Sequence, residues 1–203
     1  MICTVKSVQL HDSSIRLTIS PEGGERANEA QEHLILIPND YETCGAPVVG
    51  ARLSEEEVER LRHGGRRYEA LSRALRILAA GDNSASLLFT KLRRHGIDRA
   101  DAAFAVKYAL SHGYLHEESQ IERLILKKAE EKLWGRARIL EDLRAKGYRS
   151  EDIHAVLDRL ESSGALDFED ICTRLFEKKH PKNNLERAKI AMQHGFDLPD
   201  AYD

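Results

Sequence analysis

The chain has 203 residues, of which 41% are hydrophobic, 32% charged and 6% aromatic, and its formal net charge is −3. This is the composition of an ordinary globular protein with a charged surface. It contains no apolar run near the ~18 residues that cross a bilayer, and its few aromatic residues disfavour an aromatic stacking platform.

The compartment can be inferred from the N-terminus and the cysteines. The segment Met1–Lys6 lacks a charged start followed by an apolar stretch, so no signal peptide is expected. The three cysteines, Cys3, Cys44 and Cys172, are widely spaced and form neither a disulfide framework nor a CxxC pair. A reducing cytoplasm is therefore the expected location.

The net charge hides an uneven distribution along the chain. Residues 1–65 carry six Lys or Arg and 11 Asp or Glu, for a charge of −5. Residues 66–149 carry 18 and 11, for +7, and residues 150–203 carry seven and 12, for −5. A basic centre between acidic ends favours a polyanion or an acidic protein groove as its partner, although uneven surface decoration would give the same pattern.

The first part of the chain is predicted to be rich in β-structure. Residues 2–10, 14–20 and 32–37 are rich in β-branched residues and are predicted to be strands, followed by a loop over residues 39–50. Ser54 and Glu57 form a capping box for a helix, with Leu53 and Val58 as its hydrophobic staple. This helix is expected to end at Gly64-Gly65, which makes residues 1–65 an N-terminal extension.

From residue 66 onward, apolar residues recur at helical spacing and an internal repeat is present. At an offset of 51, Leu92-Arg93-x-x-Gly96 aligns with Leu143-Arg144-x-x-Gly147. Between residues 87 and 115 there are seven identities in 29 aligned pairs, several times the ~6% expected by chance. The predicted fold is therefore mainly α: three-helix repeats over residues 66–115 and 116–166 and a truncated third over 167–203, in an elongated, curved body.

Catalysis has no positive support in the sequence. His112 and His116 are four residues apart, but Gly113 lies between them and no third metal ligand is near, so they are interpreted as helix-end histidines. The sequence contains neither a phosphate-binding GxxxxGK loop nor a GxSxG nucleophile motif. We expect no enzymatic activity, no metal and no cofactor.

The basic residues are the more informative candidates. They gather near the ends of the predicted helices and, over residues 123–138, on the first helix of the second repeat and its exit. Positions 120, 124, 127, 128 and 131 do not form one clean apolar stripe, so this helix is expected to be largely solvent-facing. Favourable charge placement against the helix dipole explains part of this pattern, and a repeated basic ridge that meets phosphates or carboxylates is the alternative. Trp134 is expected to belong to the core. The predicted contact residues are Arg93, Arg94, Lys127, Lys128, Lys132, Arg136, Arg138, Arg144 and Lys146.

Together these residues resemble the RecX family. The resemblance covers about residues 66–200 and rests on an ordered set of segments: 70–78, 84–96, Gly113-Tyr114-Leu115, and Gly135-Arg136-x-Arg138-Ile139 followed by Leu143-Arg144-x-Lys146-Gly147. Leu53 to Val58 also resembles the N-terminal extension of many members. The chain departs from the family at Leu115-His116-Glu117 and Gln120-Ile121, where a Leu-Asp-Asp turn and Phe-Ala are usual.

The resemblance implies a non-enzymatic, monomeric regulator. RecX proteins bind the RecA nucleoprotein filament and restrain its strand exchange, ATPase and co-protease activities, which tempers recombination and the SOS response. The expected partner is thus the RecA filament, with single- or double-stranded DNA as a further ligand and no membrane. Two alternatives stay open: a helical protein that binds DNA without RecA, and a helical-repeat adaptor for another protein.

Overall fold

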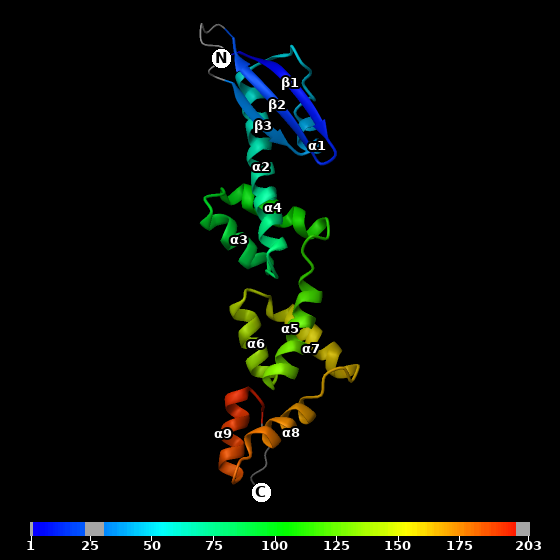
Figure 1. The fold of residues 1–203 in the computed structure, drawn as a ribbon, viewed down its shortest axis with the longest axis vertical. Helices are drawn as coiled ribbons and strands as arrows, with labels where there is room; N and C mark the ends of the chain where they lie inside the picture. Colours follow the sequence, from blue (N-terminus) through cyan, green and yellow to red (C-terminus); the bar gives the residue numbers. More distant parts are fainter. Residues whose placement is uncertain (1, 23–30, 198–203) are drawn as a thin grey trace. The chain divides into compact units, whose positions relative to one another are not determined.

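The structure is a computed structural model that describes residues 2–22 and 31–197. The chain is mainly helical, with a small β-rich N-terminal part, as predicted (Figure 1). It folds as two compact units, one formed by Met1–Ala79 and Phe89–His112 and the other by Ala80–Leu88 and Gly113–Asp203.

The first unit contains an antiparallel sheet of four described strands in the order β3-β2-β1-β4. The strands are β1 (Cys3–His11), β2 (Ser14–Pro21), β3 (Glu32–Leu36) and β4 (Arg52–Leu53). Alternate residues of β2, including Leu17 and Ile19, are fully buried, because successive side chains of a strand point to opposite faces. The three predicted strands are confirmed to within one residue. The prediction missed β4 and the short helix α1 (Pro38–Thr43), which occupies part of the expected loop.

Helix α2 (Glu55–Ala79) continues through Gly64 and Gly65. The prediction that this helix ends at the two glycines was therefore wrong. The capping box at its start is confirmed, since Ser54 N donates to Glu57 Oε2 at 2.7 Å and Glu57 N to Ser54 Oγ at 3.3 Å. A side chain on Gly64 would meet Leu36 Cδ2 at 2.7 Å. The glycines therefore allow close packing of α2 on β3 rather than ending the helix, at a cost of about 1 kcal/mol each in helix propensity.

The helical part of the first unit is built on α2. Helix α4 (Arg99–Ser111) packs against it through small residues, with Ala102, Ala105 and Ala109 fully buried. Helix α3 (Ala85–Arg94) contributes residues to both units. Small side chains at spacings of three and four residues let the two helix backbones approach closely.

The second unit contains α5 (Glu117–Lys132), α6 (Arg136–Ala145), α7 (Ser150–Ser162), α8 (Phe168–Lys179) and α9 (Asn184–His194). Its core is formed largely by α5, α6 and α7. The expectation that the first helix of the second repeat, which is α5, is largely solvent-facing was therefore wrong. Ile121, Ile125 and Ala129 are completely buried in α5. They recur every four residues, so the apolar stripe lies one residue away from the positions on which the prediction was based.

The internal repeat is present in the element boundaries. Helices α6 and α7 begin and end 51 residues after α3 and α4, and α9 begins 48 residues after α6. The glycines that end α3, α6 and α9 share one left-handed conformation, with φ of 82° at Gly96, 83° at Gly147 and 81° at Gly195. The predicted division at residue 65 is crossed by α2, and residues 198–203 of the predicted third repeat lie outside the described residues.

Consecutive repeats meet at a helix junction that occurs twice in the second unit. Gly135 N, at the start of α6, donates to the carbonyl of His194 at 2.7 Å, and Ala137 N donates to Gly195 O at 3.1 Å. One repeat earlier, Ser84 Oγ donates to Lys146 O at 2.7 Å. The unpaired N–H groups at the start of α6 are thereby satisfied by carbonyls at the end of α9.

Candidate partner-binding surface

The structure distributes the nine predicted basic residues over both units. Arg93 and Arg94 end α3 in the first unit, and the other seven lie on α5 and α6 or at their ends in the second. Arg93 Nη1 donates to the carbonyl of Ile97 at 2.6 Å, so it caps its own helix end. Arg94 is exposed.

Lys128 and Lys146 are paired inside the second unit. Their ammonium groups lie 3.3 and 2.5 Å from Asp142 Oδ2, and only 19% of the Lys128 side chain is exposed. Burial of Asp142 raises the pKa of its carboxyl, but hydrogen bonds from Lys146 and Lys128 outweigh burial and hold that pKa below its usual value. The two lysines therefore join α5 to the end of α6.

Trp134 lies between two cations, half-buried against the core of the second unit as predicted. Lys128 Nζ is 4.4 Å from the centroid of its ring and the Arg138 guanidinium is 4.3 Å away. Arg138 Nη1 also donates to the carbonyl of Gln193 at 2.7 Å. Cations over an indole face are attracted by the ring quadrupole. Lys128 and Arg138 therefore hold the Trp134 ring, in the segment that connects α5 to α6, in place.

Arg136 is engaged by α7. Its guanidinium is 2.5 Å from Asp158 Oδ1 and also pairs with Glu161. Four of the nine predicted residues thus have charges that are ion-paired or stacked within the protein: Lys128, Arg136, Arg138 and Lys146. Arg144 is exposed and donates to Ser150 Oγ at 2.7 Å.

Arg94, Lys127 and Lys132 form no ion pair with any residue in the part of the chain that the structure describes, and all three are exposed. With Arg144, they are the predicted residues whose charges are most available to a partner. Arg94 belongs to the first unit and the other three to the second. The contact role of all nine residues stays a prediction.

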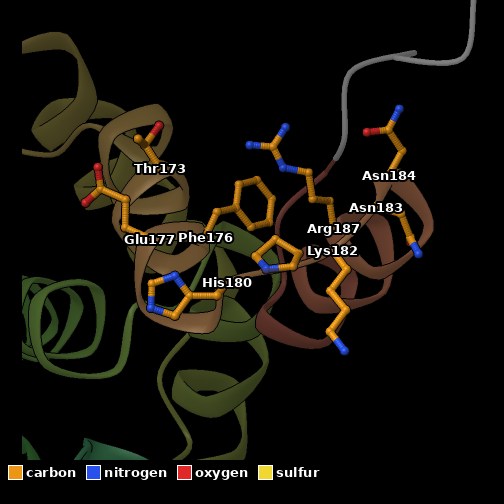
Figure 2. Close-up of a pocket in the computed structure, with 9 residues that line it drawn as sticks. Thr173, Phe176, Glu177, His180, Lys182, Asn183, Asn184 and Arg187 are labelled. Atoms are coloured by element: carbon orange, nitrogen blue, oxygen red, sulfur yellow. The ribbon is translucent and has the colours of Figure 1, made fainter.

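The sequence interpretation missed a cavity of about 490 Å³ between α8 and α9 (Figure 2). It is lined by Thr173, Phe176, Glu177, His180, Pro181, Lys182, Asn183, Asn184 and Arg187. The Arg187 guanidinium lies 5.0 Å from the centroid of the Phe176 ring. The signal that could have found this cavity is the internal repeat, which places Thr173 and Phe176 at the positions of Glu122 and Ile125.

The histidines have helix-end surroundings. His112 stacks on Tyr108 with ring centroids 3.7 Å apart, and His116 precedes α5. Among the described residues, no three His, Cys, Asp or Glu side chains are grouped as metal ligands. The described helices also include none that is long and apolar enough to span a membrane.

Comparisons with known proteins agree with this geometry at the level of fold. No protein-family model and no curated protein sequence matches the chain. Solved structures do match it, and two of them are RecX proteins. The "regulatory protein RecX" matches with a TM-score of 0.70 and 14% identity, over 96% of this chain and 95% of that one. RecX from Lactobacillus salivarius matches with a TM-score of 0.55 and 14% identity, over 66% of this chain and 90% of that one. The chain therefore has the fold of the RecX proteins.

Proposed function

We propose that this protein is a RecX-type regulator that binds the RecA nucleoprotein filament in the cytoplasm and mainly inhibits its recombinase, ATPase and co-protease activities. The observation that carries the proposal is the fold match, which extends over 96% of the chain and includes the N-terminal sheet. The basic centre of the sequence, with a charge of +7 over residues 66–149, adds electrostatic support.

The contact surface that we propose is narrower than the full set of nine basic residues. We assign to the filament contact the four residues that face solvent, where they would meet phosphates or carboxylates: Arg94, Lys127, Lys132 and Arg144. The other five are assigned to support, because their side chains are already paired, stacked or hydrogen-bonded within the protein: Arg93, Lys128, Arg136, Arg138 and Lys146. Paired charges contribute less to a new interface because their existing contacts must first be broken.

The test is ATP hydrolysis by purified RecA assembled on single-stranded DNA, measured with increasing amounts of the full chain. We expect the rate to fall to less than half at saturation, and the chain to sediment with the filaments. Unchanged hydrolysis together with absence from the filament pellet would contradict the proposal.

A parallel measurement separates the proposal from direct DNA binding. Fluorescence anisotropy of the same labelled DNA, with the chain but without RecA, should show weak binding that disappears by about 200 mM salt. Tight binding without RecA, with an unchanged RecA rate, would instead identify a DNA-binding protein. Binding to neither RecA nor DNA would favour an adaptor for another protein.

A further inference from the structure

The third helix of the second repeat makes contacts that define where such a helix packs. In α7, Arg159 lies 3.1 Å from Glu122 of α5, and Asp158 lies 2.5 Å from Arg136 at the start of α6. Positions 122 and 136 therefore mark the two walls that receive the third helix. Ile125 of α5 is completely buried beside them.

The corresponding walls of the last repeat line the α8–α9 cavity. Thr173 stands 51 residues after Glu122, and Asn184 stands 48 residues after Arg136. Both line the cavity, and so does Phe176, the equivalent of Ile125 (Figure 2). The cavity between α8 and α9 is thus the position that a third helix occupies in the preceding repeat.

Burial at equivalent positions supports this assignment. Ile121 and Ile125 of α5 are completely buried, whereas their equivalents Cys172 and Phe176 in α8 are only half-buried. The described part of the chain therefore leaves an apolar surface in α8 with less cover than its counterpart has. Burial of an apolar side chain is favourable, so the uncovered surface favours an occupant.

The charges at the cavity indicate the occupant. Its lining carries two cations, Lys182 and Arg187, and one carboxylate, Glu177. The surrounding segment, residues 173–190, carries six Lys or Arg and two Asp or Glu, a net charge of +4. Arg159 meets two carboxylates in the second repeat, Glu118 and Glu122. Thr173 replaces Glu122, so one of these two acidic groups is missing in the last repeat. Lys182 and Arg187 line the cavity beside Phe176. A helix that fits must bring apolar residues on one face and carboxylates at its edges.

We propose that the α8–α9 cavity binds an amphipathic acidic helix of a partner protein, which packs there as α7 packs on α5 and α6. The proposal concerns a surface separate from the basic residues assigned to the RecA filament, and it does not depend on that assignment. It follows the helix-in-groove mode of recognition, in which side chains at every third or fourth position anchor the helix.

The probe is a fluorescein-labelled peptide with the α7 sequence, residues 150–162, in which Arg159 is replaced by Glu. This keeps the apolar positions of α7 and raises its acidic character. Binding to the full chain is measured by fluorescence anisotropy, and a second peptide that also carries Leu157→Asp is the control. We expect saturable binding of the first peptide and at least tenfold weaker binding of the second. Equal affinity of the two peptides would overturn the proposal.

Matched variants on the same two helices locate the binding site. Arg187→Glu and Phe176→Asp should weaken binding about tenfold. Lys189→Glu and Leu185→Asp, which remove the same kinds of side chain at exposed positions away from the cavity, should leave it unchanged. The folding of each variant is checked by circular dichroism. If only the Lys189 and Leu185 variants weaken binding, the peptide binds elsewhere and the proposal is wrong.

A charge exchange tests the position without altering the core, because Thr173 is exposed. Thr173→Glu restores the acidic group present at Glu122. It should weaken the binding of the acidic peptide and strengthen the binding of the unmodified α7 peptide, whose Arg159 then has a partner. The order of the two affinities should reverse, each by about threefold. An unchanged order of affinities would overturn the assignment. So would a dimer of the full chain in sedimentation velocity that is dissociated by Phe176→Asp, because the occupant would then be a second copy of the chain.

Discussion

Basic side chains in this protein fall into two kinds that the sequence does not distinguish. Lys127 and Lys128 are neighbours, yet Lys127 is exposed while Lys128 lies against Asp142 and the Trp134 ring. The difference arises from the helix period, since successive residues of a helix point about 100° apart. Neighbours in the sequence therefore contribute to different properties of the molecule.

Substitution of the two lysines should separate stability from surface charge. Lys128→Ala removes the ion pair and the ring contact and should lower the free energy of unfolding by about 1–2 kcal/mol. Lys127→Ala should change it by less than about 0.5 kcal/mol. Urea unfolding followed by the fluorescence of Trp134 measures both values. Equal losses would show that the Lys128 contacts contribute nothing specific.

Gly135 illustrates a steric requirement without backbone strain. Its φ is −80°, which any residue can adopt, but an added Cβ would lie 2.7 Å from Phe196 N. Gly135→Ala should therefore destabilise the protein by about 2–3 kcal/mol, as overpacking does. Gly164→Ala is the control, because Gly164 has φ of 72° but nothing within 4 Å. Gly164→Ala should lower the free energy of unfolding only by the cost of placing a Cβ in the left-handed conformation, about 1 kcal/mol. Urea denaturation gives both values, and a smaller loss for Gly135→Ala would contradict the steric argument.

Tyr148 gives a prediction at alkaline pH. Burial, followed by the charges of Asp82 and Glu117, raises the pKa of Tyr148 to about 12. Its hydroxyl donates to Gln120 Oε1 at 2.9 Å. The folded state holds this proton more tightly than the unfolded state, whose value is near 10. The associated stability is therefore complete below pH 10 and is lost as the pH rises from about 10 towards 12.

Tyr148→Phe should remove this alkaline loss. The variant should cost about 1 kcal/mol at pH 7, through the missing hydrogen bond, and its free energy of unfolding should fall less steeply than that of the wild type between pH 10 and 11. Chemical denaturation at these pH values measures the slopes. Parallel slopes would show that Tyr148 does not titrate as assigned.

At the scale of elements, the sequence predicted the repeated helices well and misjudged the elements whose positions depend on tertiary contacts. The spacing of Leu92-Arg93-x-x-Gly96 and its copy located helix ends correctly, because a left-handed glycine is a local requirement. Gly64 could not be interpreted locally, since its role depends on Leu36, which is distant in the sequence. The face of α5 was misjudged because charged residues obscured a stripe of only three fully buried positions.

Helices of the last repeat should be less stable than those before it. Helix α9 has one buried residue, Ala191, whereas α7 has four: Ile153, Val156, Leu157 and Leu160. Amide hydrogens in α9 should therefore exchange at least tenfold faster than those in α7 under native conditions. Hydrogen–deuterium exchange with mass spectrometry resolves the two helices. Equal protection would mean that α9 unfolds only together with the whole unit.

For the whole molecule, the sequence identified the cations but not their partners. Arg136 pairs with Asp158 and Glu161, and Arg138 with the carbonyl of Gln193. These contacts join residues more than twenty positions apart, so no local pattern indicates them. The α8–α9 cavity was missed for the same reason, because its lining is recognised only when the helices of the last repeat are compared with those of a folded repeat.

The proposed filament contact can be tested on the exposed cations alone. Lys127→Ala with Lys132→Ala should weaken inhibition of RecA's DNA-dependent ATPase several-fold, and more at low salt than at high salt, because exposed charges are screened. Lys6→Ala with Arg16→Ala, which removes two exposed cations from the sheet, should leave inhibition unchanged. Circular dichroism confirms folding. Equal effects of the two double variants would show that net charge, and not position, matters.

The helix junctions imply an order of events during synthesis of the chain. The amides of Gly135 and Ala137, at the start of α6, bond to carbonyls of His194 and Gly195 at the end of α9. Those acceptors leave the ribosome some sixty residues later than the donors, which takes about 3–12 seconds at ordinary rates of translation. Each repeat is thus completed by the one that follows it, and a nascent chain that stalls before residue 194 leaves α6 with an unfinished end.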